Sequence, residues 1–500
     1  MMADRWVTGR ALRMAAADRA YSGALPAQVS NGEETSYPYV ANYSKGLPHD
    51  SAGLVDQTAY RLLLRAVGTG RPEDFERIPL GGVRRLVNPQ AGLAFHAEGP
   101  DSQGLVMPPA PRIDSPQNSS EMAELYWMAL TRDVKFANFT TDSIVAAAAD
   151  DLTNNFTDFR GPKINGVVTP DTLFRGDTPG DLAGPFISQF LFKDIRYGTF
   201  LIRQRQGTVA AGVDYLTTFA EWLDVQNGAA RMPNGPDPSL PARYIQTPRD
   251  LATYVHFDAL YEAYLNALLI LISMNAPFDA GNPYNFSNNQ QGGSTYGVPH
   301  ILTLVAEVAT RAMNAVFFQK WFVHRRLRPE EFGGRIESCR LGLSAFPMID
   351  QEILDSPVLE TVLDTFGSHL LAQAYTEGSP NHPSYGAAHA AVATACVTTL
   401  KAWFDESFVI PDPVVPNAAG TGLEPAPGDP VLTLGDELNK LAANMSIGRN
   451  MAGVHWRTDF SEAIELGEAI AIGILQDQKQ ATNEDASFTI TRMDGTTVTI

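Results

Sequence analysis

The segment Glu377–Phe404 constrains the fold of this chain of 500 residues more than any other stretch. It begins as a loop rich in Pro, Gly and Ser that carries His382, and from Ala387 it continues as a run of small residues with His389 near its start. Proline and glycine before Ala387, with no further proline until Pro411, predict a helix that opens where the loop ends. Unpaired N–H groups and the positive end of the helix dipole would then face the loop. This predicts an anion site with two imidazoles beside it; the alternative is a buried junction with two hydrogen-bonded histidines.

Composition limits the partners and the location of the protein. An apolar fraction of 44% is typical of a globular chain with a large core, and a net charge of -19 argues against nucleic acid or an anionic membrane surface as partners. Cys339 and Cys396 are the two cysteines, so we expect neither a disulfide framework nor a cysteine metal site. The first 30 residues contain no apolar segment of the kind found in signal peptides, and the apolar run Ala267–Met274 is too short to span a bilayer. We therefore expect a cytoplasmic protein without a membrane segment.

Helical periodicity recurs along the chain, whereas strand-like alternation is confined to its end. The predicted helices are Gln57–Val67, Glu121–Asp133, Thr141–Asp150, Thr217–Val225, Leu251–Met274, His300–Leu327, Asp350–Tyr375, Ala387–Phe404, Leu432–Arg449 and Phe460–Gln478. The rest of residues 1–116 is predicted to be irregular, the proline-rich stretch 411–430 is predicted to be a surface excursion, and the last 14 residues predict a β-hairpin turning at Asp494-Gly495. The fold class is therefore mainly α, with helical bundles, a catalytic half like a four-helix bundle, and minor peripheral β-hairpins.

Three regions follow from this organisation. Residues 1–250 form an N-terminal region of helices and loops that we expect to pack on the rest. Residues 251–480 contain the predicted bundle and the segments rich in histidine and cations, and residues 481–500 form the hairpin tail.

A second segment, Lys320–Pro329, concentrates basic residues. Lys320, His324 and Arg328 are spaced four apart, which predicts that they share one helix face. Like charges stacked in this way repel each other, and a helix tolerates them best when an anion lies opposite. The alternative is a solvated basic face, although Trp321-Phe322-Val323 between the charges argues against full solvation.

The third segment contains Arg449, His455 and Asp459. His455 and Asp459 are four apart, so the carboxylate can accept the second N–H of the imidazole, fix its tautomer and raise the basicity of the free nitrogen. A surface ion pair is the alternative. Together the three segments offer donors suited to a tetrahedral oxyanion, with one histidine free to bond its central atom. Phosphate and vanadate both remain candidates at this point.

These motifs resemble those of the vanadium-dependent haloperoxidases, in particular the algal and cyanobacterial bromoperoxidase branch, whose superfamily includes the type 2 phosphatidic acid phosphatases. The matching motifs are Lys320…Arg328-Pro329 with seven intervening residues, His382-Pro-Ser-Tyr-Gly-Ala-Ala-His389, and Arg449-x5-His455-x3-Asp459. One position pair departs from the family, because Ala387-Ala388 stands where the family has Ser-Gly. The missing hydroxyl would donate to a vanadate oxygen, a bond worth about 1.5–3 kcal/mol, so weaker vanadate binding is expected.

The resemblance implies a role for each matched residue. His455 would be the protein ligand of vanadium, while Lys320, Arg328, Arg449 and the backbone N–H of Ala388 would hold the vanadate oxygens. His389 would be the general acid and base toward hydrogen peroxide, and Lys320 would polarise the bound peroxide. His382 and Phe317 would line the halide pocket, and Asp459 would support His455.

The implied activity is oxidation of bromide, with chloride and iodide as alternatives, by hydrogen peroxide to hypohalous acid that halogenates a small organic acceptor. An acid phosphatase of the same superfamily with a histidine nucleophile is a second hypothesis, and a non-catalytic oxyanion-binding protein is a third. The resemblance also implies a homo-oligomer, either a dimer or a dodecamer. A structural calcium ion in an acidic or carbonyl-rich loop is a further expectation.

Overall fold

The computed structural model describes residues 2–23 and 25–500. The helices up to residue 257 are α1 (Met2–Ser22), α2 (Glu33–Ser36), α3 (Gln57–Thr69), α4 (Pro72–Phe75), α5 (Pro116–Leu130), α6 (Ser143–Asn154), α7 (Phe219–Gln226) and α8 (Pro248–Phe257). Four 3-10 helices lie among them within the described residues, namely η1 (Ala91–Leu93), η2 (Ser102–Gly104), η3 (Phe136–Thr141) and η4 (Gln189–Leu191).

The second half of the chain is also helical. Its helices are α9 (Glu262–Ser273), α10 (Val298–Phe318), the π-helix η5 (Gln319–His324), α11 (Pro329–Arg340), α12 (Gln351–Asp355), α13 (Pro357–Phe366), α14 (Ala388–Trp403), α15 (Leu434–Met451), α16 (Arg457–Ser461) and α17 (Ala463–Ala481). Three antiparallel hairpins lie at the periphery: β1 (Ile195–Tyr197) with β2 (Phe200–Ile202), β3 (Val414–Pro416) with β4 (Leu423–Pro425), and β5 (Thr489–Thr491) with β6 (Thr497–Thr499). The mainly α fold class and the terminal hairpin are confirmed.

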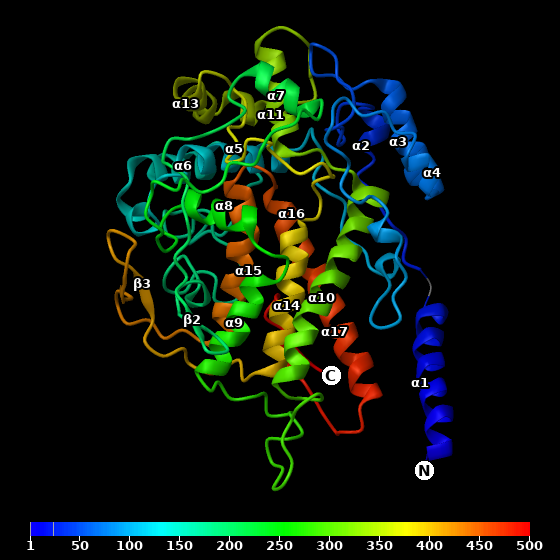
Figure 1. The fold of residues 1–500 in the computed structure, drawn as a ribbon. Coiled ribbons are helices and arrows are strands. Elements are labelled where there is room, and N and C mark those ends of the chain that lie inside the picture. Colours follow the sequence, from blue (N-terminus) through cyan, green and yellow to red (C-terminus); the bar gives the residue numbers. More distant parts are fainter. Residues whose placement is uncertain (1, 24) are drawn as a thin grey trace.

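A bundle of α10, α14, α15 and α17 forms the centre of the molecule, and α14 packs against each of the other three (Figure 1). Alanine and other small residues make up much of α14, so its neighbours approach closely. A Cβ atom on Gly467 of α17 would lie 2.1 Å from the carbonyl oxygen of Ala391, so only glycine fits there. Every residue of α14 except His389 is buried. The bundle therefore presents this histidine at the end where α14 begins.

One hydrophobic core extends from Ala41 to Met493 and draws on both predicted halves of the chain. The division at residues 250 and 480 therefore stays a prediction. Within the described residues, Val298–His324 is the one continuous helical stretch that is long and apolar enough to cross a membrane, and 56% of its apolar window is buried inside the protein. It is a core helix of the bundle.

Several predicted boundaries were wrong for reasons of local geometry. Leu251–Met274 is not one helix: α8 and α9 are bent by 100° at a break that contains Asp258. His300–Leu327 changes to a π-helix at Gln319, and Arg325 then adopts a left-handed conformation with φ 45°.

Asp350–Tyr375 is also divided. Pro357 begins a new helix, α13, and Gly367 ends it with φ 78°. The region 1–116, predicted to be irregular apart from one helix, contains the helix α1, and α11 lies in a stretch for which no helix was predicted. The proline-rich stretch 411–430 carries the hairpin β3–β4, whose two strands end at Pro416 and Pro425.

Candidate functional site

The three motif segments meet at one end of the bundle. η5 supplies Lys320, the first residue before α11 supplies Arg328, and the last turn of α15 supplies Arg449. The loop that precedes α14 brings His382, and the turn between α15 and α16 brings His455. All five side chains are buried. Residues up to 135 positions apart in sequence therefore converge on one place.

Lys320 and Arg328 are anchored by backbone carbonyls. Nζ of Lys320 donates to the carbonyl oxygens of Pro383 (2.9 Å) and Ser384 (2.6 Å). Arg328 donates to the carbonyl oxygens of His382 and Val454, at 2.9 and 2.7 Å. Burial lowers the pKa of Lys320 well below its ordinary value, with Arg328 adding to the effect, and burial lowers the pKa of Arg328 to about 10.

The two basic residues do not share a helix face, contrary to the prediction. Arg328 lies after the left-handed Arg325 and begins α11, whereas Lys320 belongs to η5. His324 is turned away from them, packs edge-on against the ring of Tyr385 at 4.8 Å, and both of its ring nitrogens are buried without a hydrogen bond in the described structure. The chain reversal after His324 brings Lys320 and Arg328 together.

His455 and Asp459 form the predicted pair. Nδ1 of His455 lies 2.7 Å from Oδ2 of Asp459, so the neutral ring carries its proton on Nδ1 and its lone pair on Nε2, which accepts a hydrogen bond from Nη1 of Arg328 at 3.0 Å. Asp459 also accepts bonds from the backbone N–H of Trp456 at 3.0 Å and from the hydroxyl of Ser384. The pair is buried, which excludes the surface ion pair. Burial, with the charges of Arg328 and Lys320, lowers the pKa of His455 well below its ordinary value, so the ring is neutral at pH 7.

Arg449 is held by α8 and by an aromatic ring. Nη1 donates to the carbonyl oxygen of Val255 at 2.8 Å, and the guanidinium lies over Tyr375 at 5.3 Å from the ring centroid. The Nε atom of Arg449 is buried and has no hydrogen-bond partner in the described part of the chain. This donor is available to a bound anion.

His389 lies in the first turn of α14, with 27% of its side chain exposed. Its Nε2 lies 3.2 Å from Oδ1 of Asp258, at the break between α8 and α9. Ala387 is the N-cap residue of α14, and among residues 2–23 and 25–500 no side chain caps the first N–H groups of this helix. Ala388 is the first helical residue and is buried.

His382 packs against Phe317, with ring centroids 5.2 Å apart, and its Nδ1 lies 2.9 Å from Nη2 of Arg328. Burial lowers the pKa of His382 well below its ordinary value, and the charges of Arg328 and Lys320 add to this. The two residues predicted for the halide pocket therefore touch each other beside the cationic cluster.

The donor set fits a tetrahedral oxyanion. Three buried cations, Lys320, Arg328 and Arg449, face two neutral histidines, and Asp459 shares its charge with Arg326 through a contact of 3.2 Å. Buried charge of one sign is costly unless a counter-ion compensates it. The uncapped N-terminus of α14 and the unpartnered Nε of Arg449 add donors to the same place.

The sequence missed five residues that support this site: Asp258, Ser384, Tyr375, Arg326 and Glu121. Ser384 lies inside the His382–His389 motif, so its position was a usable signal. Arg326 lies inside the basic segment Lys320–Pro329, where it is one arginine among several, and the other three lie in segments with no motif that distinguishes them.

The chain is similar to known proteins over almost its whole length. A family model described as the second helical-bundle domain of VCPO matches residues 369–484. The vanadium-dependent bromoperoxidase of Corallina officinalis is 37% identical, with 98% of this chain and 97% of the relative covered. That of Ascophyllum nodosum is 36% identical, with 96% and 89% covered. A solved structure, the homohexameric second vanadate-dependent bromoperoxidase of Ascophyllum nodosum, superposes with a TM-score of 0.92 at 29% identity over 99% of this chain and 90% of that one.

The fold is that of the helical vanadium-dependent bromoperoxidases, and buried cations and histidines converge at one end of its bundle. The chain belongs to the vanadium-dependent bromoperoxidase family. Vanadate is the cofactor that this family requires, and the residues at the site fit it. The comparisons favour neither the acid phosphatase nor the non-catalytic binding protein.

Proposed function

We propose that this protein catalyses the vanadate-dependent oxidation of bromide by hydrogen peroxide to hypobromous acid, which then halogenates a small organic acceptor. Chloride and iodide are alternative halides. The observation that carries the proposal is the convergence of Lys320, Arg328, Arg449 and His455 with His389 at the start of α14. When bound, vanadate supplies a Lewis acid that activates hydrogen peroxide without a change in oxidation state.

Each residue has a proposed role that follows from its surroundings. Lys320, Arg328, Arg449 and the N–H of Ala388 hold the oxygens of the anion, and Lys320 also polarises the bound peroxide. The lone pair of His455 lies on Nε2 because the ring is neutral and Asp459 holds its other nitrogen, so His455 can bond the vanadium once Arg328 releases Nε2.

His389 is the proposed general acid and base. It is the partly exposed histidine of the site, and Asp258 at 3.2 Å orients its ring. A base in this position can take a proton from incoming hydrogen peroxide and return it to the leaving oxygen. His382 and Phe317, in contact beside Arg328, are the proposed lining of the halide pocket.

One assay tests the activity. Purified protein freed of vanadate is supplied with bromide, hydrogen peroxide and a dye that changes colour on bromination, with and without added orthovanadate. We expect bromination only when orthovanadate is present, and little hydrolysis of a phosphate ester under the same conditions. Phosphate-ester hydrolysis without vanadate-dependent bromination would overturn the proposal.

We also propose that the protein is a homo-oligomer in which α1 contacts another copy. Figure 1 shows α1 standing beside the body, next to α17. None of its side chains that the structure describes is buried; Trp6 is 84% exposed and Tyr21 is 91% exposed. An exposed ion pair of 2.9 Å, Arg19–Asp477, links it to α17. A helix gains most of its stability from packing of one face, and this one leaves its apolar residues uncovered.

Two further features support a second copy as the partner of α1. Val7, Met14 and Tyr21 are spaced seven apart, which places them on one side of the helix. The helix carries four arginines against two aspartates, while the chain as a whole has a net charge of -19, so charge favours contact between α1 and the surface of another copy. The structural relative that covers 99% of this chain is described as homohexameric. The dimer or dodecamer implied by the resemblance stays a prediction.

Calcium and location also stay predictions. Among the described residues no group of three or more His, Cys, Asp or Glu side chains could hold a metal ion, so a structural calcium ion would depend on backbone carbonyl oxygens.

A further inference from the structure

We propose that Glu121 is a positioning residue for His455. It acts through Arg326 and sets how much of the negative charge of Asp459 is available to the imidazole. The inference rests on the proposed role of His455 as the residue that bonds vanadium. It concerns α5, an element that lies outside all three motif segments.

A continuous chain of buried hydrogen-bonded groups connects Glu121 to His455. Nδ1 of His455 lies 2.7 Å from Oδ2 of Asp459, and Nη1 of Arg326 donates to Oδ1 of the same carboxylate at 3.2 Å. Nη2 of Arg326 then donates to Oε2 of Glu121 at 3.2 Å. Glu121, Arg326 and Asp459 are 3%, 1% and 0% exposed, so water screens none of these contacts.

Arg326 is fixed between the two carboxylates. Its guanidinium lies over the ring of Trp456 at 4.5 Å, and Nη2 also donates to Oδ1 of Asn118 at 3.0 Å. Because Trp456 covers one face of the guanidinium and both Nη atoms are hydrogen-bonded, the side chain of Arg326 cannot move toward solvent when one partner changes. Its charge therefore remains beside Asp459 whatever stands at position 121.

The sign of the effect follows from this arrangement. The guanidinium of Arg326 is shared by the carboxylates of Glu121 and Asp459, so it compensates the negative charge of each of them only in part. Without the charge of Glu121, Arg326 would be compensated by Asp459 alone, and Asp459 would become a weaker acceptor for the N–H of His455. Nε2 of His455 would then be less basic and would bond vanadium less strongly.

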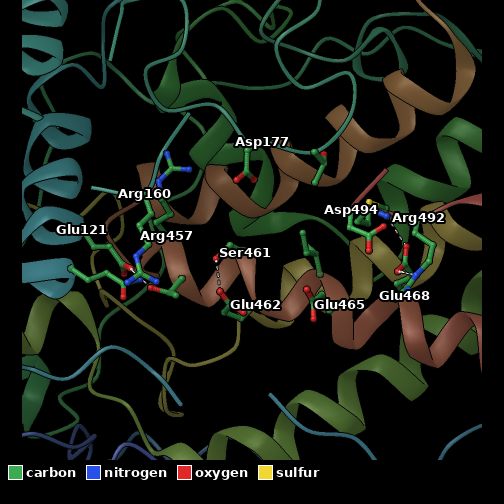
Figure 2. A pocket seen from close by; sticks show the side chains of 15 residues that line it. Glu121, Arg160, Asp177, Arg457, Ser461, Glu462, Glu465, Glu468, Arg492 and Asp494 are labelled. Atoms are coloured by element: carbon green, nitrogen blue, oxygen red, sulfur yellow. Dashed lines mark hydrogen bonds and ion pairs between the residues drawn. The ribbon is translucent and has the colours of Figure 1, made fainter. Parts of the chain in front are cut away.

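Glu121 also lines a pocket of about 340 Å³ that α5, α16, α17 and the terminal hairpin surround. Figure 2 shows Glu121 beside Arg457 at one end of this pocket, with Glu462 and Glu465 farther along it. The hydroxyl of Thr458 donates to the other oxygen of Glu121, which keeps the carboxylate aimed at Arg326. Replacement of this carboxylate by an amide changes its charge with almost no change in volume.

α5 provides a matched control three residues further along. Glu124 is equally buried and also binds an arginine, because Nε of Arg457 donates to it at 2.8 Å. Arg457 continues to the carbonyl oxygen of Arg175 at 3.1 Å. The pair Glu124–Arg457 is therefore a buried ion pair on the same helix whose hydrogen bonds lead away from Asp459.

The test compares E121Q with E124Q as purified proteins freed of vanadate. Orthovanadate binding is measured by calorimetry, and the bound anion is observed by ⁵¹V NMR. We expect E121Q to bind orthovanadate about three- to tenfold more weakly than the wild type and to shift the ⁵¹V resonance. The loss of affinity should be smaller than the loss caused by removing a group that contacts His455 directly. E124Q should match the wild type in both measurements. Equal binding by E121Q and the wild type, or equal weakening in both variants, overturns the inference.

Moving the carboxylate to a neighbouring position should restore the affinity that E121Q loses. In E121Q/N118D the carboxylate moves to position 118, whose side chain already accepts a bond from Arg326. This double variant should regain the wild-type affinity and resonance, and failure to regain them argues against a role for charge. If E121Q does not fold, N118D alone should tighten binding about threefold by the same reasoning, and an unchanged affinity overturns the inference.

Orthovanadate binding by the wild type and by H455A distinguishes failure of this inference from failure of the proposed function. If the wild type does not bind orthovanadate, the proposed function fails. If the wild type binds it, H455A does not, and E121Q equals the wild type, only the role of Glu121 fails.

Discussion

Arg328 donates a hydrogen bond from Nη1 to Nε2 of His455 across 3.0 Å. This is the nitrogen that we propose bonds vanadium, so Arg328 would have to release it and could donate to the anion in its place. Arg328 keeps its bonds to the carbonyl oxygens of His382 and Val454, and the movement it needs is therefore small. The site is largely preorganised, and the exchange replaces a neutral acceptor by a charged one.

His455→Ala should abolish vanadium incorporation, whereas His389→Ala should leave vanadium bound and lose most of the turnover. The physical reason is position: His455 is buried among the cations, while His389 stands at the partly exposed start of α14. Elemental analysis of both purified variants after incubation with orthovanadate checks this. Equal loss of vanadium in the two variants would contradict the assignment of roles.

Asp258→Asn should lower turnover about tenfold or more while vanadate affinity stays unchanged, because Asp258 contacts the proposed proton-transfer residue and none of the proposed vanadate-binding groups. An asparagine keeps the shape but cannot hold the imidazole with a charge. Steady-state bromination and calorimetric titration with orthovanadate together measure the two effects. A parallel fall in affinity would show that Asp258 acts on the vanadate site as a whole.

Ala387→Ser should stabilise the protein and tighten vanadate binding. Ala387 is the N-cap of α14, where a hydroxyl can accept the N–H of Ala390 and donate its own hydrogen to the anion. The cap is worth about 1 kcal/mol. The added donor to the anion is worth about tenfold in affinity, or less if the tight packing of Ala387 resists the extra oxygen.

Thermal unfolding without vanadate measures the cap, and reconstitution with graded orthovanadate measures the donor. Halide preference should change little, because His382 and Phe317 lie elsewhere in the site. A higher melting temperature with unchanged half-saturation would show that the hydroxyl only caps the helix.

Deletion of residues 2–22 should reduce the mass of the assembly without unfolding the body, because α1 covers none of the bundle core. Val7→Glu/Met14→Glu/Tyr21→Glu should act in the same direction by charging one side of α1. Light scattering coupled to gel filtration gives the masses, with Arg19→Ala as a control that breaks only the ion pair to Asp477. A wild-type oligomer whose mass survives the deletion would exclude α1 from the interface, and a monomeric wild type would exclude the oligomer itself.

His324→Phe should make the fold more resistant to acid. Burial lowers the pKa of His324 from 6.5 to about 3, so the unfolded chain takes up a proton below pH 6.5 that the folded chain does not accept until about pH 3. The free energy of unfolding of the wild type therefore falls by about 1.4 kcal/mol per pH unit through this window from this one residue. Phenylalanine removes that contribution, and it fills similar space against Tyr385.

Denaturant unfolding at pH 8 and at pH 5 checks this prediction. The free energy of unfolding of the variant, relative to that of the wild type, should be higher at pH 5 than at pH 8. A difference that is the same at both pH values would mean that His324 is protonated or unprotonated alike in the folded and unfolded states.

The chemistry of the site was largely determined by the sequence alone. The four-residue spacing of His455 and Asp459 predicted that the carboxylate accepts the second N–H of the imidazole, and Nδ1 of His455 lies 2.7 Å from Oδ2 of Asp459. The helix after Ala387 and the terminal hairpin about Asp494-Gly495 followed from local rules of proline, glycine and alternation. Such features depend on neighbours within a few residues, which a sequence shows directly.

Only the tertiary structure decided which distant groups complete the site. Asp258 reaches His389 across 131 positions, Ser384 reaches Asp459 across 75, and Arg326 joins Glu121 across 205. The break between α8 and α9 and the reversal at Arg325 place Asp258 and Arg328, and helical periodicity predicted neither of them. The reason is physical. Contacts of this kind form when helices pack, and a buried carboxylate or arginine looks the same in a sequence as one on the surface.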